Sequence, residues 1–497
     1  MNALFVYPKF AETFWSWKWA LKFVGKKAAF PPLGLITAAA MFSKSWEKKL
    51  VDLSVCDLAD EDINWADYVF VSAMAAQSDS TKAVILRCKE NNVPVVLGGP
   101  ILQQGCEEFG DVSHFLLGEA ENILIEFLSD LQANNAKRIY SAKSFPELAD
   151  SPIPLWKLLN IDAYASMLVQ YGRGCPHKCT FCNVATINGR VPRVKSPEQF
   201  LRELDALYDT GFLGAVMFAD DNLIGNKPRA REMLAGLVEW QKKHGYPFEF
   251  TAEVDITLAE EDDLMDLMVQ AGFKKVFLGL ETPNNGSLIE CGKTQNAKRD
   301  MVACVRKLLQ HGLIPMSGFI VGFDADNPRI FVKQMVRFIQ EAPIVVAMVG
   351  VLQAPPGAEL YRNMEKEGRL RDKSTGNNLD LYPNFETKMS VDILVAGFKK
   401  IWATIYSPRV YYERIETLLR EYNAETKPVG KMTAPDIGAF WASVWRIGFL
   451  GGPVVSYYYW KTLLLAFFKY PKALPEAVAF QIYGAHFRRI AKNIKRA

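Results

Sequence analysis

The chain has 497 residues, and 49% of them are hydrophobic, which suffices for two to four domains with sizeable cores at about 100–200 residues per domain. Its formal net charge of +3 gives no electrostatic reason to expect nucleic acid as a partner. Residues 1–8 lack the charged start and apolar core of a signal peptide, so we expect a cytoplasmic protein, in which clustered cysteines bind metal more often than they form disulfides.

Short apolar runs alternate with helical stretches from residue 1 to about residue 135. The runs are Ala3–Tyr7, Lys49–Val55, Tyr68–Ser72, Val93–Leu97 and His114–Leu117. This alternation predicts a parallel sheet covered by helices. We therefore expect a Rossmann-like α/β domain over residues 1–140.

Ligands of such sheets bind beyond the carboxyl ends of the strands, where this sequence places small and polar residues. Glycine there allows a bulky ligand to approach the backbone closely, although glycines after strands are more often simply turns. The candidate binding residues at these strand ends are Ser72, Ala73, Met74, Gly98, Gly99 and Glu119.

Three cysteines follow the next apolar run at C-x3-C-x2-C spacing: Cys175, Cys179 and Cys182. Three thiolates can hold three irons of a four-iron cluster and leave the fourth iron open to a substrate, whereas a four-cysteine cluster usually relays electrons. The alternative is a chance grouping in a loop, and the order of the surrounding elements argues against it. We assign the three cysteines as ligands of a 4Fe-4S cluster.

Six repeats of strand followed by helix occupy residues from about 165 to 352. The strand candidates are Ser166–Tyr171, Ala215–Ala219, Phe248–Val254, Lys275–Leu280, Ile314–Val321 and Val345–Leu352. The pattern predicts a partial (β/α)6 barrel in a domain over residues 150–360. Ser196, followed by a proline and a glutamine, predicts the capped start of one of its helices.

Active sites of such barrels lie at the carboxyl ends of the strands. In chain order, those ends carry the cysteine loop and then a series of acids and glycines. The series is Asp220, Asp221, Glu253, Glu281, Gly318 and Gly322. Each acid taken alone could be a solvated or helix-capping carboxylate, but their order favours one shared site.

In place and order, these segments resemble those of the radical S-adenosylmethionine (SAM) enzymes. The resemblance implies that Asp220 or Asp221 contacts the SAM amino group and that Glu253 and Glu281 hold other polar parts of SAM. It implies further that the two glycines of the fifth strand make room for adenine. Two roles remain open for Phe181, which either shields the cluster from water or contacts adenine.

The α/β domain ahead of the cluster loop resembles the cobalamin-binding domain of cobalamin-dependent radical SAM enzymes. Pro31-Pro32-Leu33-Gly34-Leu35 and Gly118-Glu119-Ala120-Glu121 resemble segments common in that group. No histidine precedes His114, so the lower cobalt ligand of the cobalamin mutases has no counterpart here. The resemblance therefore implies cobalamin without a histidine ligand, and a vestigial domain that binds none is the alternative.

The barrel pattern ends near residue 360, and we expect a helical domain over 361–497. Gly376-Asn377-Asn378 and the stretch 405–414 resemble a C-terminal domain of uncharacterised role in the branch that includes the hopanoid C-2 methyltransferase. Residues 440–496 are rich in aromatic residues and end in a basic stretch. This composition suits helices packed on the barrel, contact with a membrane interface, or a membrane span, for which the uncharged run Ile447–Trp460 is short.

The combined interpretation is a cobalamin-dependent radical SAM methyltransferase that acts at an unactivated carbon of an apolar, lipid-like substrate. A radical SAM cyclase or another rearrangement enzyme is the alternative, and a redox protein that holds only the cluster is the alternative outside the enzymes. The resemblance implies an external one-electron reductant of the flavodoxin or ferredoxin type and no nucleic acid. Peripheral contact with the inner face of the membrane stays open.

Overall fold

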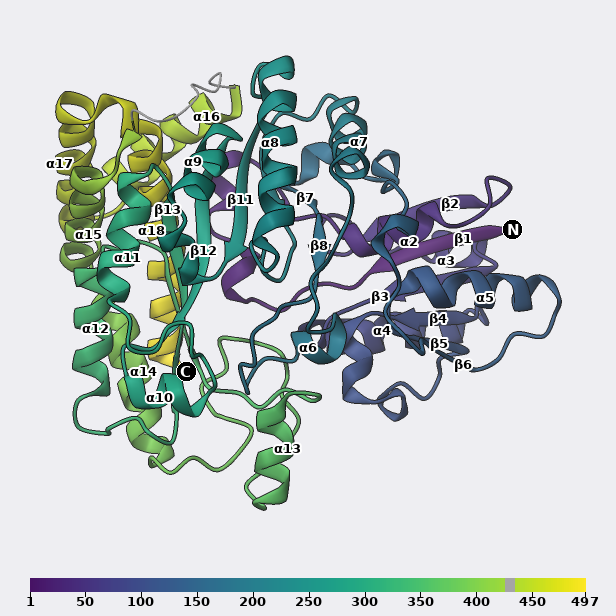
Figure 1. The fold of residues 1–497 in the computed structure, drawn as a ribbon. Coiled ribbons are helices and arrows are strands. Elements are labelled where there is room, and N and C mark those ends of the chain that lie inside the picture. The colour runs from purple at the N-terminus through teal and green to yellow at the C-terminus, as the bar shows by residue number, and fades with distance from the viewer. Residues whose placement is uncertain (425–433) are drawn as a thin grey trace.

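A computed structural model describes residues 1–424 and 434–497. It contains two six-stranded parallel sheets, the first in the N-terminal part and the second in the middle of the chain. Figure 1 shows the first sheet and its helices on one side of the molecule and the second sheet in the centre. The C-terminal helices lie on the far side of the second sheet. The expected α/β class, with its barrel and helical C-terminal region, is confirmed.

The N-terminal sheet has the strand order β2-β1-β3-β4-β5-β6. Its strands are β1 (Asn2–Tyr7), β2 (Glu47–Asp52), β3 (Tyr68–Ser72), β4 (Val95–Gly98), β5 (His114–Leu117) and β6 (Ile139–Ser141). Five of them coincide with the predicted runs, whereas β6 was not predicted because its three residues show no apolar pattern of their own. The helices of this domain are α1 (Leu21–Val24), α2 (Leu33–Ala40), α3 (Asp60–Trp65), α4 (Ser78–Glu90) and α5 (Ala120–Gln132).

Strand β1 shows why these sequences form buried strands. Leu4 and Val6 pack into one hydrophobic core, and Ala3 and Phe5 pack into a second core on the opposite face of the sheet. Because both faces are covered by helices, the strand is a continuous apolar run rather than an alternating one. Full burial of a side chain such as Phe5 contributes about 1.5–3 kcal/mol.

The strand order of this sheet reverses between β1 and β3. The chain moves from β1 to β2 on one side and then to β3 on the other. In open parallel sheets, ligands bind at such a switch point, beyond the carboxyl ends of the two strands. The structure therefore places a candidate ligand-binding edge near Tyr7 and Ser72.

The second sheet has the order β14-β13-β12-β11-β10-β7, and all its strands are parallel. The strands are β7 (Met167–Val169), β10 (Gly214–Phe218), β11 (Phe248–Val254), β12 (Phe273–Glu281), β13 (Ile314–Val321) and β14 (Ala347–Val351). Each overlaps its predicted run. The sequential order of the strands is that of a partial barrel, as predicted.

Helices follow the strands of this barrel. They are α7 (Pro197–Tyr208), α8 (Lys227–His244), α9 (Asp262–Gln270), α10 (Asn285–Glu290), α11 (Met301–Gln310), α12 (Phe331–Glu341) and α13 (Glu359–Lys366). The predicted capping residue is confirmed, since the Ser196 hydroxyl accepts a hydrogen bond from the Gln199 amide. Two short strands, β8 (Gly172–Arg173) and β9 (Arg193–Val194), frame the cysteine loop and its helix α6 (Val184–Ile187).

A segment that the sequence did not single out, residues 8–31 between β1 and α2, covers the open edge of the barrel beside β7. The amides of Lys27 and Ala28 donate to the Ala163 carbonyl at 2.8 and 3.1 Å. The amide of Ala165 donates to the Ala28 carbonyl at 3.0 Å. Further along the segment, the Trp15 ring lies 5.0 Å from the Phe277 ring of β12. The N-terminal part of the chain thus completes the wall of the barrel.

The C-terminal helices pack outside β14. They are α14 (Val391–Ile405), α15 (Pro408–Glu421), α16 (Ala434–Ser443), a π-helical turn (Val444–Phe449), α17 (Pro453–Lys469) and α18 (Leu474–Arg496). The Trp402 indole of α14 donates to the Val349 carbonyl of β14 at 3.0 Å. No helix among residues 1–424 and 434–497 is both long and apolar enough to cross a bilayer.

Candidate active site

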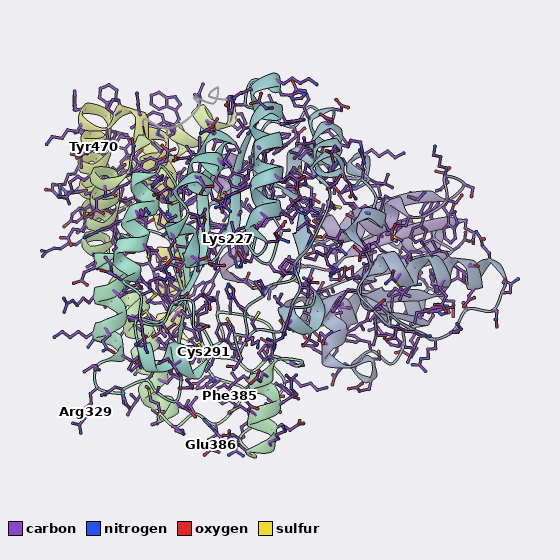
Figure 2. All side chains as sticks on the ribbon, in the orientation of Figure 1. Lys227, Cys291, Arg329, Phe385, Glu386 and Tyr470 are labelled. Carbon is purple, nitrogen blue, oxygen red and sulfur yellow. The ribbon has the colours of Figure 1, made fainter. Side chains whose placement is uncertain are left out.

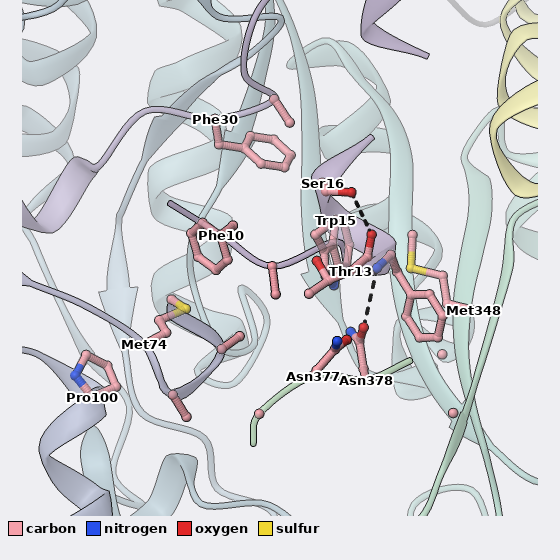
Figure 3. Close-up of a pocket in the computed structure, with 18 of the residues that line it drawn as sticks. Phe10, Thr13, Trp15, Ser16, Phe30, Met74, Pro100, Met348, Asn377 and Asn378 are labelled. Carbon is pink, nitrogen blue, oxygen red and sulfur yellow. Dashed lines mark hydrogen bonds between the residues drawn. The ribbon is translucent and has the colours of Figure 1, made fainter. Parts of the chain in front are cut away.

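A cavity of about 1190 Å³ lies between the carboxyl ends of the two sheets. This exceeds the roughly 300–1,000 Å³ of a usual small-molecule site, so the cavity has room for more than one ligand. Its walls come from segment 8–31, the loops after β3 and β4, the cluster loop and the strand ends of the barrel. In Figure 3, Met74 and Pro100 line one side and Met348 the other, with Phe10 and Trp15 between them.

Two neighbouring carboxylates that follow β10 accept hydrogen bonds from the backbone at the start of the cluster loop. Asp220 accepts hydrogen bonds from the amides of Tyr171 at 2.9 Å and Gly172 at 2.6 Å. Asp221 accepts from the amide of Gly174 at 2.8 Å and from the side chain of Asn188 at 2.9 Å. Burial raises the pKa of Asp220 to about 7 in spite of its two backbone donors.

Asp220 and Asp221 both line the cavity, as expected of SAM-binding residues. Their hydrogen bonds give them a second task that the sequence did not reveal, because they hold the backbone that carries the cysteines. The predicted contact of one of them with the SAM amino group stays a prediction.

The three cysteines of the loop lie close to one another and are partly buried. Burial raises the pKa of Cys182 to about 12, and neighbouring thiols add to this effect. The pKa values of Cys175 and Cys179 are also raised, first by burial. Thiols in such surroundings ionise when they bind a metal, so iron binding would release protons.

The donor set of the cluster loop consists of three cysteine thiols. Over residues 1–424 and 434–497, no three His, Cys, Asp or Glu side chains are arranged to hold one ion. The thiolates of a cubane cluster bind three different irons and need not converge on one point. Thiolate is also the ligand that iron-sulfur clusters use.

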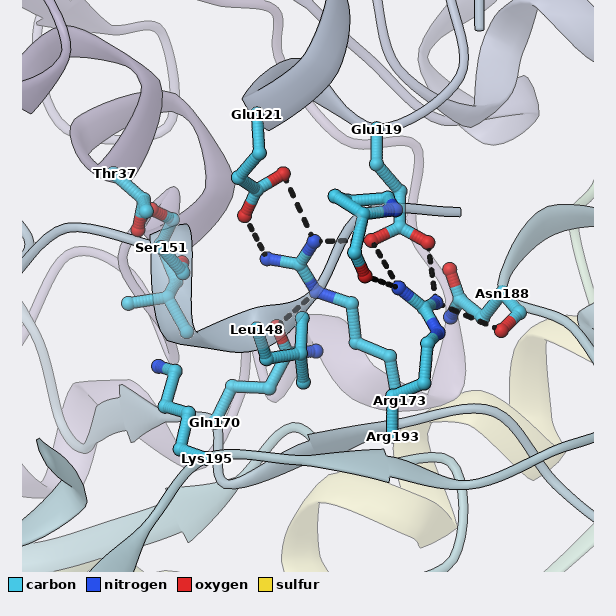
Figure 4. A network of polar contacts seen from close by, with 12 residues as sticks. Thr37, Glu119, Glu121, Leu148, Ser151, Gln170, Arg173, Asn188, Arg193 and Lys195 are labelled. Carbon is cyan, nitrogen blue, oxygen red and sulfur yellow. Dashed lines mark hydrogen bonds and ion pairs between the residues drawn. The ribbon is translucent and has the colours of Figure 1, made fainter. Parts of the chain in front are cut away.

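Glu119 lies in a buried network that joins the N-terminal domain to the cluster loop (Figure 4). The guanidinium of Arg173, two residues before the first cluster cysteine, pairs with Glu119 and binds both oxygens of Glu121, at 2.8 and 3.1 Å. The other oxygen of Glu119 pairs with Arg193. Burial alone would raise the pKa of Glu121, but its bonds to Arg173 hold that pKa below the ordinary value.

The sequence analysis predicted that Glu119 binds a cofactor. In the structure its carboxylate instead pairs with Arg173 and Arg193. The residue does not line the cavity, and its carboxylate is bound by two arginines. Arg173 and Arg193 were missed because their partners lie more than fifty residues away in the sequence. An arginine inside a cluster motif was the one signal that could have drawn attention to this network.

Glu253 and Glu281 both line the cavity, and their carboxylates have different surroundings. Among the residues that the structure describes, none forms a hydrogen bond or ion pair with the Glu253 carboxylate, and burial raises its pKa to about 7. Glu281 lies at a register shift at the end of β12, with φ of 63°, and pairs with the Lys293 ammonium at 2.8 Å. A free carboxylate beside an ion pair fits the ammonium and carboxylate groups of an amino-acid ligand such as SAM.

Lys293 was not predicted, because its position after α10 gives no local sign of a site. The Glu281 carboxylate and the Cys179 thiolate raise its pKa above the ordinary lysine value, against the opposing effect of burial. A buried cation thus lies between the predicted SAM-binding acid and the cluster loop.

Gly318 in β13 and Gly322 directly after it have different environments. Gly318 lines the cavity, as expected for a residue that makes room for a ligand, and so does Phe181 of the cluster loop. Gly322 lies away from the cavity, and its φ of 105° is one that side chains rarely adopt. Its amide donates to Asp326 at 2.9 Å, so its role in the structure is a turn after the strand.

The predicted cobalamin-binding residues are only partly gathered at the cavity. Met74 lines it and is 49% exposed, whereas Ser72, Ala73, Gly98 and Gly99 do not line it. Gly99 has φ of 92°, and a Cβ there would come within 2.9 Å of the Ala73 carbonyl. This glycine therefore lets two loops of the protein pack together rather than leaving space for a ligand.

The residues after these predicted positions form the cavity wall instead. They are Ala75, Ala76, Pro100, Gln103 and Gln104. Together with Met74 they form a mixed apolar and amide-bearing surface near the switch point of the sheet. None of the described residues that line the cavity is a histidine, which fits cobalamin bound without a histidine ligand.

The side chains of segment 8–31 give the cavity an aromatic wall. Phe10, Phe14, Trp15 and Phe30 line it, and the Trp15 ring is tilted against the Phe277 ring inside the barrel. An aromatic-rich stretch between two predicted strands was the available sign of this wall. Aromatic walls suit an apolar ligand.

Comparisons with known proteins agree with this architecture. Residues 169–335 match the family model of the Radical SAM superfamily, and residues 358–497 match a domain of unknown function, DUF4070. The chain is 37% identical over 453 residues to an uncharacterized methyltransferase of Synechocystis sp., covering 90% of this chain and 84% of that protein. It is 31% identical over 427 residues to the hopanoid C-2 methylase of Rhodopseudomonas palustris, covering 84% and 78%.

Among solved structures, the fold is similar to that of OxsB, a cobalamin-dependent S-adenosylmethionine radical enzyme with aqua-cobalamin and S-adenosylmethionine bound. The TM-score is 0.64 at 12% identity, and the match covers 100% of this chain and 80% of that one. At this identity the similarity concerns the fold.

Proposed function

The chain belongs to the radical SAM superfamily, in the branch that includes the hopanoid C-2 methylase, and on this premise we propose that it is a cobalamin-dependent methyltransferase acting at an unactivated carbon of an apolar substrate. One observation carries the proposal. The cluster loop, the acids at the barrel strand ends and the switch point of the N-terminal sheet all adjoin a single cavity.

Different parts of the site suit the three cofactors, and the three cysteines lie in the loop beside the cavity without lining it themselves. Cys175, Cys179 and Cys182 would hold the iron-sulfur cluster. Asp220 or Asp221 would contact the SAM amino group, and Glu253 would bind another polar part of SAM. Met74 and its neighbours would support cobalamin. When bound, the reduced cluster and SAM supply hydrogen-abstracting radical chemistry, and cobalamin supplies the methyl group.

The chain's own residues would position these groups and exclude water. Asp220 and Asp221 fix the backbone of the cluster loop through three amides. The buried ion pair of Glu281 and Lys293 keeps one charge of each sign beside the SAM site. Proximity of the groups in one cavity is what a reaction between several bound partners requires.

The aromatic wall of segment 8–31 supports an apolar substrate, and a lipid is the class we propose. The similarity of the chain to the hopanoid C-2 methylase supports the same class. An external one-electron reductant of the flavodoxin or ferredoxin type would reduce the cluster. We place the protein in the cytoplasm, in peripheral contact with the inner face of the membrane.

Anaerobic reconstitution tests the cluster assignment. The wild-type chain should bind about four irons and form 5′-deoxyadenosine from SAM after reduction. Alanine at all three loop cysteines should abolish both, whereas Cys304→Ala, outside the loop, should abolish neither. Full iron content in the triple variant would refute the assignment.

Electron paramagnetic resonance tests cobalamin binding independently. The cobalt(II) form should bind and show no nitrogen splitting from a protein histidine, because no histidine lines the described cavity. A chain that cleaves SAM but binds no cobalamin would have a vestigial N-terminal domain. That result would refute the methyltransferase proposal and keep the radical SAM assignment.

A further inference from the structure

The helical hairpin of residues 434–469, which we call the aromatic hairpin, has an outward face that is unusually apolar. Ile437, Trp441, Trp445 and Phe449 follow at intervals of four residues and are 48%, 63%, 61% and 61% exposed. The exposed side chains of Leu450, Val454, Tyr457, Leu464, Phe467 and Phe468 extend this face. Figure 2 shows ring side chains projecting outward over α16 and α17. Contiguous apolar surfaces of this kind mark interaction sites.

The inner face of the aromatic hairpin is well packed, so its outer face is not a sign of poor folding. Val444, Ile447 and Tyr459 form a buried cluster with Ala20 beside α1. The Tyr459 hydroxyl lies 2.8 Å from the Ser443 hydroxyl, and the Trp460 indole donates to the Gly448 carbonyl at 3.1 Å. The rings of the outer face are therefore held in place on a rigid support.

The helix that the hairpin packs against belongs to the wall of the active-site cavity. Arg446 donates to the Lys22 carbonyl at 2.9 Å and lies over the Phe23 ring. Lys22 and Leu21 also line the cavity, as does Trp15 deeper in the same segment. Segment 8–31 thus connects the aromatic hairpin directly with the interior of the barrel.

The cavity reaches the surface at a basic rim. Lys18, Lys22 and Lys27 line it and are exposed. The ammonium of Lys18 pairs with Glu12 at 3.3 Å, and that of Lys27 donates to the Val55 carbonyl at 3.2 Å. Lys22 lies 4.6 Å from the centre of the Trp19 ring. The aromatic hairpin therefore contacts, through Arg446 and Lys22, the same segment that carries the exposed lysines of the rim.

We propose that the aromatic hairpin and this lysine rim dock on an anionic lipid bilayer, and that the apolar substrate passes from the bilayer into the cavity along segment 8–31. The substrate part of the inference rests on the proposed function, and the docking part does not. Aromatic rings settle at the headgroup level while lysines reach the lipid phosphates. No described helix can span a bilayer, so the contact would be peripheral.

Charge favours a bilayer over a second copy of the chain. A symmetric dimer through the same face would bring two lysine rims together, and like charges oppose such a contact. An anionic lipid surface instead attracts all three lysines at once.

Vesicle sedimentation of the full-length chain tests the docking. The probes are phosphatidylcholine vesicles with and without phosphatidylglycerol, at low and high salt. Trp441→Ser, Trp445→Ser and Phe449→Ser combined should lower binding at least about tenfold to both kinds of vesicle. Lys18→Glu with Lys22→Glu should lower binding only to the anionic vesicles, by roughly fivefold or more per lysine at low salt.

Matched changes elsewhere provide the controls. Leu86 and Ile125 are 52% and 63% exposed on the N-terminal domain, and their replacement by serine should leave vesicle binding unchanged. Lys44→Glu, an exposed lysine far from the rim in sequence, should also have little effect. Circular dichroism and retained iron loading would show that each variant folds.

Hydrogen exchange locates the contact. Anionic vesicles should slow exchange in residues 14–27 and 437–457 and leave α4 and α5 unchanged.

Equal sedimentation of wild-type and hairpin variants would overturn the inference, as would a hairpin variant that loses self-association instead of vesicle binding. Formation of 5′-deoxyadenosine needs no vesicles, so its persistence would show that only the docking inference had failed.

Discussion

Replacement of Arg173 by methionine tests how the cluster loop is held to the N-terminal domain. The side chain of Arg173 is 13% exposed, and those of its partners Glu119 and Glu121 are 8% and 4% exposed. Methionine keeps much of the length of the arginine but removes the charge and the donors to both acids. Glu121 would then be buried without its cationic partner, while Glu119 would keep Arg193.

The expected loss of unfolding free energy follows from the burial of the Glu121 carboxylate. Removal of one member of a buried ion pair destabilises a protein by about 3–5 kcal/mol, because a charge is left without compensation. A domain of the size of residues 1–140 has an m-value of about 2 kcal/mol/M in urea, so the midpoint of the transition that unfolds this domain should fall by roughly 1.5–2.5 M. Arg337→Met removes an exposed pair with Glu341, 72% and 48% exposed, and should cost about 0–1 kcal/mol.

Tryptophan fluorescence of the apoprotein during urea unfolding provides the measurement. Arg173→Met combined with Glu121→Gln should recover part of the loss, since a neutral amide is less costly to bury than an unpaired carboxylate. Hydrogen exchange should show the largest change around the cluster loop and the start of α5. Equal midpoints for the Arg173 and Arg337 variants would refute the reasoning, as would a double variant no more stable than Arg173→Met alone.

Three further predictions concern single residues. Because burial raises the pKa of Glu253 to about 7, SAM should bind the reconstituted protein more tightly as pH rises through about 7. Folding stability from the protonated acid should already fall as pH rises from the ordinary value of 4.5 to about 7, and equilibrium dialysis and urea unfolding should show both dependences flattened by Glu253→Gln. Gly397→Ala places a Cβ 2.1 Å from the Phe331 ring and should cost about 1–3 kcal/mol in the unfolding free energy, whereas Gly34→Ala, with open space around it, should cost nothing. Ser196→Ala removes the cap of α7 and should lower the unfolding free energy by about 0.5–2 kcal/mol, and an unchanged urea midpoint would contradict that role.

Elements whose signal is local could be predicted from the residues of the chain. Parallel strands buried on both faces are continuous apolar runs, so β1, β3 and β14 could be recognised from their residues alone. The spacing of Cys175, Cys179 and Cys182 likewise defines a cluster loop within a few residues. The order of these elements was sufficient to predict two α/β domains and the family.

The set of residues that share the cavity depends on how distant segments pack, and no local pattern indicates it. Glu119 pairs with arginines 54 and 74 residues away, and Lys293 reaches Glu281 after an intervening helix. Segment 8–31 closes the barrel through backbone bonds to residues near 163, and nothing local marks that pairing. Such contacts depend on the packing of distant segments, whereas hydrophobic periodicity reports only neighbours along the chain. The residues of the strands could therefore be predicted from the sequence, and the partners of the charged and aromatic side chains could not.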